Sequence, residues 1–185
     1  MSLTESTMLE LGTPAPDFAL ADVTTGNTIR RSDVSDKDAL LVMFICAHCP
    51  YVKHIEKALG KLGKDYAAKN IRIVAISSND AITHPTDNPS GLKGQARNFG
   101  FTFPYLYDET QAVAHAYKAA CTPDFFLFDG DFTLVYRGQF DASRPGNDVA
   151  VTGEDLRAAI DLVLAGKPVP TEQRPSIGCN IKWKG

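Results

Sequence analysis

The sequence predicts an α/β fold in which a central mixed sheet carries helices on both faces. Three observations lead to this prediction. An apolar strand, an amphipathic helix and a second apolar strand follow one another between residues 39 and 76. Residues 124–137 carry a strong hairpin signal, and a further amphipathic helix follows before residue 166. Strand–helix–strand units are typical of parallel strands and a hairpin adds antiparallel neighbours, so we expect both kinds of pairing in one sheet.

The first strand of this unit is expected at residues 39–45, which are apolar without a break, as in a strand buried on both faces. A helix is then predicted to begin near Pro50, a residue that is well tolerated in a first helical turn. Residues 71–76 return to a strand, and the two strands should run parallel. The helix follows from apolar side chains at helical spacing, namely Val52, Ile55, Leu59, Leu62 and Tyr66.

The second half of the sheet is expected from residues 124–128 and 134–137, which flank a DGD turn and should pair as antiparallel neighbours. The last helix is predicted to have Thr152 as its N-cap and Gly166 as its stop. Its apolar positions are Leu156, Ala159, Ile160, Val163 and Leu164.

A single domain is expected to span residues 1–185, with a core at about 12–166 and a tail at 167–185. A chain of 185 residues is long enough for one compact domain with a substantial core. Three prolines should keep the tail extended. Residues 79–90 (NDAITHPTDNPS) are predicted to form a long surface loop within this domain.

The charge balance argues against several classes of partner. The chain has 19 Lys and Arg residues against 22 Asp and Glu residues, a formal net charge of −3, and neither sign forms a block. We therefore expect neither nucleic acid nor a membrane surface as a partner. The longest apolar run, residues 39–46, is less than half of the ~20 residues that a membrane span requires. An N-terminus without the pattern of a secretory signal leads us to expect a cytoplasmic protein.

Two of the four cysteines, Cys46 and Cys49, form a C-x-x-C motif at the predicted junction of strand and helix. Four cysteines are too few for a disulfide scaffold, so the motif indicates redox chemistry or metal binding. The start of a helix stabilises an anion and can lower the pKa of a thiol from ~8.5 to between ~3.5 and ~7.5. A protonated His48 would add to this effect, and Lys53 and His54 would raise the local positive potential.

Zinc binding is the main competing interpretation of the motif. Zinc normally takes four ligands, and the sequence has no second C-x-x-C motif. Cys121 and Cys179 are single and far apart, and His84 and His115 are isolated, so these two histidines are expected to serve only at the surface or in packing. Redox chemistry is therefore favoured, and neither a metal nor a haem, flavin or nicotinamide cofactor is expected.

The C-x-x-C motif, together with Thr122-Pro123 directly before the predicted hairpin, resembles the thioredoxin fold. This resemblance covers roughly residues 12–166 and implies a cis Thr122–Pro123 peptide bond that faces the two cysteines. Residues 12–20 (GTPAPDFAL) resemble the opening segment of the redoxin branch, which contains peroxiredoxins of the AhpC/TSA type and related thioredoxin-like reductases.

A departure from the peroxiredoxin pattern T-x-x-C-P bears on the activity that this resemblance implies. Cys49-Pro50 takes the cysteine–proline position, while Cys46 replaces the threonine whose hydroxyl donates a hydrogen bond to the peroxide. Loss of that donor argues against fast peroxidase activity. Three other strings, 48–54 (HCPYVKH), 143–147 (SRPGN) and 178–184 (GCNIKWK), resemble a bacterial peroxiredoxin-like subgroup.

Two enzymatic mechanisms remain open, and both make the protein a thiol-based antioxidant. In the first, a dithiol–disulfide oxidoreductase, Cys46 attacks a partner disulfide as the thiolate and Cys49 resolves the mixed disulfide. Pro123 and the backbone beside it would dock the partner's extended chain. The intervening histidine predicts a reduction potential above the ~−270 mV of thioredoxin and nearer ~−180 mV. Expected partners are a protein or small-molecule disulfide and a thiol donor such as a thioredoxin or glutathione system.

In the second mechanism, a thiol peroxidase, Cys49 attacks a hydroperoxide and becomes a sulfenic acid, which Cys46 or another cysteine then resolves. Arg144 could supply the cation that holds the Cys49 thiolate and polarises the peroxide.

The remaining cysteines fit either mechanism. Cys121 should lie close to the C-x-x-C motif, as a buried apolar filler or as a third redox thiol. Cys179 belongs to a tail that folds back over the site, reaches a second subunit, or only packs through Ile181 and Trp183. Two interpretations from other classes also stay open, a soft-metal-binding module and a redox-silent thioredoxin-like interaction module.

Overall fold

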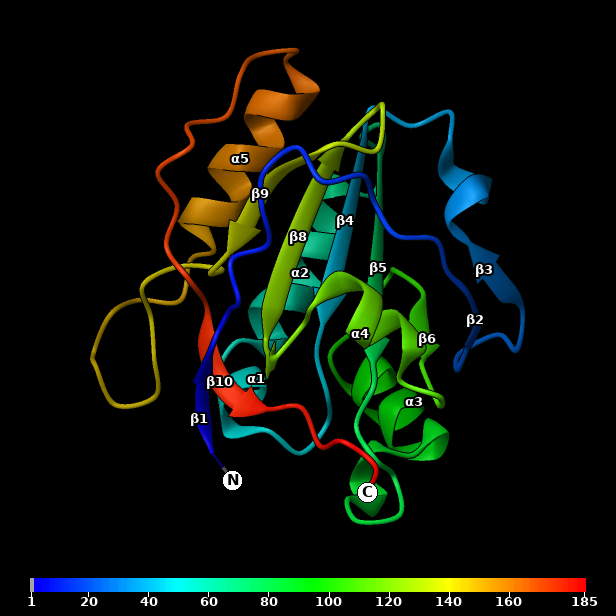
Figure 1. Ribbon diagram of the computed structural model, residues 1–185. Helices are drawn as coiled ribbons and strands as arrows, with labels where there is room; N and C mark the ends of the chain where they lie inside the picture. The colour runs from blue at the N-terminus through cyan, green and yellow to red at the C-terminus, as the bar shows by residue number, and fades with distance from the viewer. Residues whose placement is uncertain (1) are drawn as a thin grey trace.

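The computed structural model describes residues 2–185, which contain a central seven-stranded sheet (Figure 1). Its strand order is β3-β2-β6-β5-β4-β8-β9. Strand β4 pairs in parallel with β5 and antiparallel with β8, so the predicted mixed sheet is confirmed. The strands are β2 (Ala19–Asp22), β3 (Thr28–Arg30), β4 (Ala39–Phe44), β5 (Ile71–Ser77), β6 (Tyr105–Tyr107), β8 (Asp124–Asp129) and β9 (Leu134–Gly138).

Helices cover both faces of this sheet, as predicted. Successive residues of β4 point to opposite faces, so Leu41 and Met43 pack with residues of α1, α2, α3 and α5, while Leu40 and Val42 pack with α4. Each of these buried side chains stabilises the fold by about 1.5–3 kcal/mol. The helices are α1 (Pro50–Lys53), α2 (Glu56–Tyr66), α3 (Pro89–Asn98), α4 (Ala112–Tyr117) and α5 (Glu154–Leu164), with 3-10 turns at Arg31–Val34 and Pro85–Asp87.

The helix predicted to follow β4 is divided into α1 and α2. The chain leaves α-helical geometry at His54 and Ile55, where the Ile55 N–H donates to the carbonyl of Val52 in a tighter turn. All five apolar residues that predicted the helix are nevertheless buried. The two short helices therefore share the apolar face expected of one longer helix.

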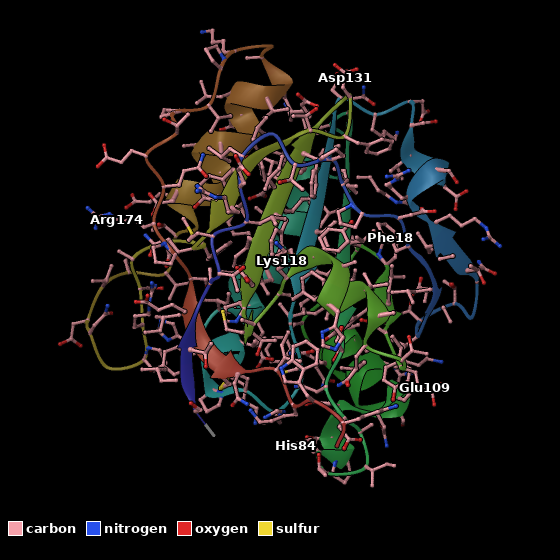
Figure 2. All side chains as sticks on the ribbon, in the orientation of Figure 1. Phe18, His84, Glu109, Lys118, Asp131 and Arg174 are labelled. Atoms are coloured by element: carbon pink, nitrogen blue, oxygen red, sulfur yellow. A yellow bond between two sulfur atoms is a disulfide. The ribbon has the colours of Figure 1, made fainter. Side chains whose placement is uncertain are left out.

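The hairpin and the last helix lie where the sequence places them. Strands β8 and β9 are antiparallel, and Asp131 lies at the tip of the hairpin (Figure 2). The predicted N-cap of α5 is wrong by one residue, because Gly153, with φ +71°, takes that position. The carboxylate of Asp141 accepts hydrogen bonds from the Thr152 and Gly153 N–H groups, at 2.8 and 2.7 Å, and so fixes the backbone directly before the helix. Gly166 follows the helix with φ +70°, as expected of a stop signal.

The segment 79–90 differs from the predicted surface loop. It includes the 3-10 turn Pro85–Asp87 and the first residues of α3. Asn79, Asp80 and Asp87 are buried in it. Polar residues are buried where partners satisfy their hydrogen bonds, and a sequence pattern does not reveal those partners.

The tail returns to the body of the protein as an extended strand. Strand β10 (Ile177–Asn180) lies between β1 (Leu3–Glu5) and β7 (Cys121–Thr122) in a second, three-stranded sheet (Figure 1). Both pairings are antiparallel. The predicted extended conformation is thus confirmed, and β10 lies beside β7, which leads into Pro123. Within residues 2–185, none of the helices has the length and apolar character needed to span a membrane.

Candidate redox site

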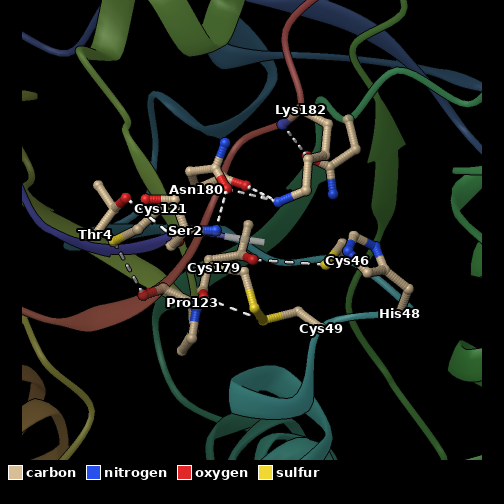
Figure 3. The surroundings of a disulfide bond; sticks show 12 residues. Ser2, Thr4, Cys46, His48, Cys49, Cys121, Pro123, Cys179, Asn180 and Lys182 are labelled. Atoms are coloured by element: carbon tan, nitrogen blue, oxygen red, sulfur yellow. Dashed lines mark hydrogen bonds between the residues drawn. A yellow bond between two sulfur atoms is a disulfide. The ribbon is translucent and has the colours of Figure 1, made fainter. Parts of the chain in front are cut away.

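The C-x-x-C segment lies where β4 ends and α1 begins. The cis peptide bond between Thr122 and Pro123 lies beside it (Figure 3). The Sγ atom of Cys46 is 3.5 Å from the Thr122 hydroxyl oxygen, and the Cys49 Sγ is 3.5 Å from the Thr122 carbonyl oxygen. The structure thus brings together the two cysteines and the Thr122–Pro123 peptide, as the resemblance implied, and the expected cis bond is confirmed.

The disulfide in this site joins Cys49 to Cys179 rather than to Cys46. The two Cα atoms are 6.2 Å apart although 130 positions separate the residues in the sequence. Cys179 lies directly across from Thr122 in the pairing of β10 with β7, which brings it to the cysteine motif. Of the three places considered for Cys179, the tail folded back over the site is the one observed. Cys46 is free and fully buried.

A close approach of the backbone makes this pairing possible. A Cβ atom on Gly178 would lie 1.9 Å from the Thr122 carbonyl oxygen. Only glycine therefore allows β10 to come so near the strand that leads into the cis bond.

His48 and Asp87 form an ion pair beside Cys46. The His48 Nδ1 contacts one carboxylate oxygen of Asp87, and the other oxygen accepts hydrogen bonds from the Ala47 and His48 N–H groups, at 2.7 and 3.1 Å. The hydrogen bond to Asp87, followed by one to Cys46, raises the pKa of His48 to about 9. His48 is therefore a cation at neutral pH, and one of its ring nitrogens lies within 4.8 Å of the Cys46 sulfur.

Asp87 supplies the negative charge of this pair. Burial alone would raise the pKa of Asp87, but hydrogen bonds from His48 and from the Asn79 amide, the latter at 2.9 Å, hold it below its ordinary value. The carboxylate is thus ionised and fixed in place by the segment that leads into α3.

Cys46, His48 and Asp87 also have the donor types of a metal site. One ligand atom from each lies within 4.8 Å of the others, and sulfur, nitrogen and oxygen are all donors to zinc. Both Asp87 oxygens are already engaged by N–H donors, however, and a zinc site needs a fourth ligand. The arrangement therefore suits a thiol beside an imidazolium–carboxylate ion pair better than a metal site.

The C-terminal residues beyond β10 close one side of this site. The Lys182 N–H donates to Asn79 Oδ1 at 2.8 Å, and the Lys182 carbonyl accepts from the Asp80 N–H at 2.8 Å. Burial lowers the pKa of the Lys182 ammonium, while the negative charges at Cys46 and Asp87 oppose that change. A further cation thus lies near Cys46, held by the same segment that holds Asp87.

The carbonyl of Cys46 is fixed by a buried hydrogen-bond chain. The Gln95 amide donates to this carbonyl at 3.0 Å and to a Glu56 carboxylate oxygen at 2.9 Å, and the Tyr105 hydroxyl donates to Gln95 Oε1 at 2.7 Å. Burial raises the pKa of Glu56. Helix α3 and strand β6 thereby position the end of β4 from which the motif begins.

Arg144 lies in the loop that follows β9, and it lines a small pocket together with Tyr51 and Pro123. Its guanidinium donates to the carbonyls of Asp141 and Ser143 and to Gln139 Oε1, each at 2.8 Å. These hydrogen bonds hold the guanidinium to its own loop. The role of Arg144 at a peroxide-reactive thiol stays a prediction.

The other singled-out residues divide into packing and site positions. His115 stacks on Trp183 with ring centroids 4.2 Å apart, as expected for a packing residue. The His84 ring, in contrast, lies 4.7 Å from the His48 ring, near the C-terminus of the chain (Figures 1 and 2). Burial and the His48 charge lower the pKa of His84. Cys121 is fully buried, and burial raises its pKa far above the usual range, which fits the apolar filler.

Sequence reasoning missed four polar residues of this site. They are Asn79, Asp87, Gln95 and Lys182, all fixed by contacts between distant segments. For Asn79 and Asp87 the available signal was the concentration of Asn, Asp and Pro in residues 79–90, which also predicts an ordinary surface loop. For Lys182 it was the string 178–184, which marks a family but not a contact.

Comparison with known proteins identifies the family. The model of the AhpC/TSA family matches residues 11–137. The chain belongs to the AhpC/TSA family. It is also similar to the thiol-disulfide oxidoreductase ResA of Geobacillus kaustophilus, with 30% identity over an alignment of 132 residues that covers 68% of this chain and 67% of the relative.

Two solved structures are similar to this chain in fold. An uncharacterized conserved protein from Geobacillus kaustophilus is 55% identical with a TM-score of 0.97, over 100% of this chain and 97% of that one. The thioredoxin domain of a thiol-disulfide oxidoreductase from Bacteroides vulgatus matches with a TM-score of 0.60 at 20% identity, over 71% and 89% of the two chains. The latter similarity shows the thioredoxin-like fold. Together with the Cys49–Cys179 disulfide, the family supports a thiol-based oxidoreductase role.

Proposed function

We propose that this protein is a thiol–disulfide oxidoreductase in which Cys46 is the attacking thiol. The observation that carries this proposal is the contact of Cys46 with His48, whose positive charge is maintained by Asp87. The thiolate is the nucleophile of disulfide exchange, and a neighbouring cation stabilises it. The similarity to a relative named as a thiol-disulfide oxidoreductase supports the same reaction class.

The reaction begins from the reduced protein. The Cys46 thiolate attacks one sulfur of a partner disulfide, forms a mixed disulfide and releases the partner's other sulfur as a thiolate. Cys49 then attacks the Cys46 sulfur as a thiolate, which forms the Cys46–Cys49 bond and releases the second partner sulfur. Two electrons pass from the protein to the partner, and a thiol donor such as a thioredoxin or glutathione system restores the two thiols.

This proposal is tested by the rate at which reduced protein reacts with glutathione disulfide. We expect Cys46→Ser to abolish most of this rate, and the matched Cys121→Ser variant to retain it, because Cys121 is a buried thiol outside the contact with His48. Equal rates for wild type and Cys46→Ser would overturn the assignment of the nucleophile.

A thiol peroxidase is the second candidate, and the Cys49–Cys179 disulfide is the observation that favours it. In this reaction the Cys49 thiolate takes one oxygen from a hydroperoxide, releases an alcohol or water, and becomes a sulfenic acid. The Cys179 thiol then condenses with the sulfenic acid, which releases water and forms the observed disulfide. Fast formation of sulfenic acid on Cys49 in a Cys179→Ser variant, with hydrogen peroxide as the oxidant, would support this candidate over the first.

A further inference from the structure

Three cysteines converge on one residue of the site. The sulfurs of Cys46 and Cys49 contact the hydroxyl and the carbonyl of Thr122, and Cys179 lies opposite Thr122 in the β7–β10 pairing. Figure 3 shows Cys46, Cys49 and Cys179 in the surroundings of Pro123. A free thiol thus lies beside a disulfide that contains its own C-x-x-C partner.

The strand that carries Cys179 occupies the position expected for a partner chain. The backbone beside Pro123 was predicted to dock an extended partner, and β10 pairs antiparallel there with Cys121–Thr122. The Ser176 hydroxyl also donates to the carbonyl of Pro123. In this respect the tail binds as an internal disulfide substrate would.

The tail is also held by contacts that do not depend on the disulfide. The Ile181 N–H donates to the Ala120 carbonyl at 3.0 Å, and the Ile181 side chain is buried. The backbone of Lys182 forms hydrogen bonds with Asn79 and Asp80. A Cys179 thiol released from Cys49 would therefore stay near the site, at the high effective concentration that favours intramolecular exchange.

We propose that Cys179 is a third redox thiol, which exchanges with Cys46 for a disulfide bond to Cys49. This inference rests on the proposed function, because it uses the same Cys46 thiolate. In the forward step this thiolate attacks the Cys49 sulfur, the Cys46–Cys49 bond forms, the Cys49–Cys179 bond breaks, and Cys179 leaves as a thiolate. No electrons leave the protein in this step, and the negative charge passes from Cys46 to Cys179.

The exchange connects the tail to partner binding. With the Cys46–Cys49 bond formed, the contacts of Ile181 and Lys182 still hold the tail, but no covalent bond ties β10 to the β7 edge, so an incoming thiol donor can compete with β10 for that edge. With the Cys49–Cys179 bond formed, β10 is tied across this edge and Cys46 is buried. The position of the disulfide would thus control whether the docking edge is open.

Disulfide mapping tests the exchange directly. Oxidised protein, free of reductant, is incubated at pH 8, quenched with acid and labelled with N-ethylmaleimide, and mass spectrometry locates the label. We expect two forms in wild type, one labelled on Cys46 and the other on Cys179. The Cys46→Ser variant should show only the form with the Cys49–Cys179 bond, and the control Cys121→Ser should show both forms. Wild type with only one of these two forms at every time point would overturn the exchange.

A glycine variant shifts the same equilibrium without touching a cysteine. Gly178→Ala places a Cβ atom where only 1.9 Å separates it from the Thr122 carbonyl oxygen, so β10 must move away from β7. We expect the label to shift from Cys46 toward Cys179. Gly94→Ala is the matched control, because a Cβ atom there meets nothing within 4 Å, and it should leave the ratio unchanged. An unchanged ratio in Gly178→Ala would contradict the proposed role of the β10 contact.

A parallel assay separates failure of the exchange from failure of the proposed function. Reduced Cys179→Ser protein is mixed with glutathione disulfide. If it reacts as fast as wild type while oxidised wild type never forms the Cys46–Cys49 bond, the proposed function stands and the exchange is wrong. If the two forms interconvert while reduced protein does not react with glutathione disulfide, the exchange stands and the proposed function is wrong.

Discussion

Substitution of Asp87 by asparagine removes the charge that keeps His48 protonated. Asparagine has nearly the same shape, and its carbonyl oxygen can still accept the hydrogen bonds from the Ala47 and His48 N–H groups. The substitution therefore changes the charge at this point more than the position of the backbone. Because the hydrogen bond to Asp87 is the largest cause of the raised pKa of His48, we expect that pKa to fall toward its ordinary value.

The size of the effect follows from the two pKa values. At pH 8 a group with a pKa of about 9 is roughly nine-tenths protonated, whereas one with a pKa of 6.5 is about 3% protonated. The hydrogen bond to Cys46 remains in the variant, so the pKa of His48 should stay somewhat above its ordinary value. We therefore expect the imidazolium population at pH 8 to fall by up to about thirtyfold.

Nuclear magnetic resonance of labelled histidine side chains measures this titration. The chain has 4 histidines, and a His48→Asn variant identifies the signal of interest. Cys46→Ser is the matched comparison and should lower the pKa of His48 less than Asp87→Asn does, because Cys46 is the second cause. Circular dichroism confirms that each variant is folded.

Two results would refute the reasoning. The first is a wild-type His48 that titrates near 6.5, since the ion pair would then not raise its pKa. The second is a larger decrease for Cys46→Ser than for Asp87→Asn, because the order of the two contributions would then be reversed.

Three further predictions concern stability and the neighbouring loop. Burial raises the pKa of Asp124 to about 7 from 3.8, so the folded state binds this proton more tightly than the unfolded state, and the free energy of unfolding should fall as pH rises from about 4 to about 7. This decrease in the free energy of unfolding is at most about 4 kcal/mol, and the Asp124→Asn variant should not show it. Urea denaturation between pH 4 and 8 measures the difference. Leu59→Ala removes most of a fully buried side chain of α2, so the free energy of unfolding should fall by about 2–5 kcal/mol in the same assay. The control Gly94→Ala should change the free energy of unfolding only by the difference in helix propensity between the two residues. Arg144→Gln should leave the rate of the reaction with glutathione disulfide unchanged, because the guanidinium is hydrogen-bonded within its own loop. A decrease in this rate of about tenfold, as loss of a functional contact would cause, would contradict that interpretation.

The parts of the fold that are encoded by local pattern were predictable from the sequence. The unbroken apolar run of β4, the helical spacing from Val52 to Tyr66 and the turn between β8 and β9 depend on residues close together in the chain. The Thr122–Pro123 bond beside the cysteines followed from the resemblance and is confirmed.

The parts that depend on pairing between distant segments were not predictable. The partner of Cys49 is set by the register of β10 against β7, over a separation of 130 residues, while the C-x-x-C spacing favours Cys46. Asp87 is buried because the amides of Ala47 and His48 and the Asn79 side chain satisfy its carboxylate. Neither the register nor those partners leaves a periodic signal in the sequence.

Trapping of a mixed disulfide tests most directly that Cys46 is the attacking thiol. The Cys49→Ser, Cys179→Ser double variant lacks both cysteines that could resolve an adduct, and it is mixed with glutathione disulfide at pH 8. We expect mass spectrometry to find one glutathione per chain, attached to Cys46. An unmodified Cys46, together with glutathione on Cys49 in the Cys46→Ser variant, would show that Cys49 is the nucleophile and contradict the account.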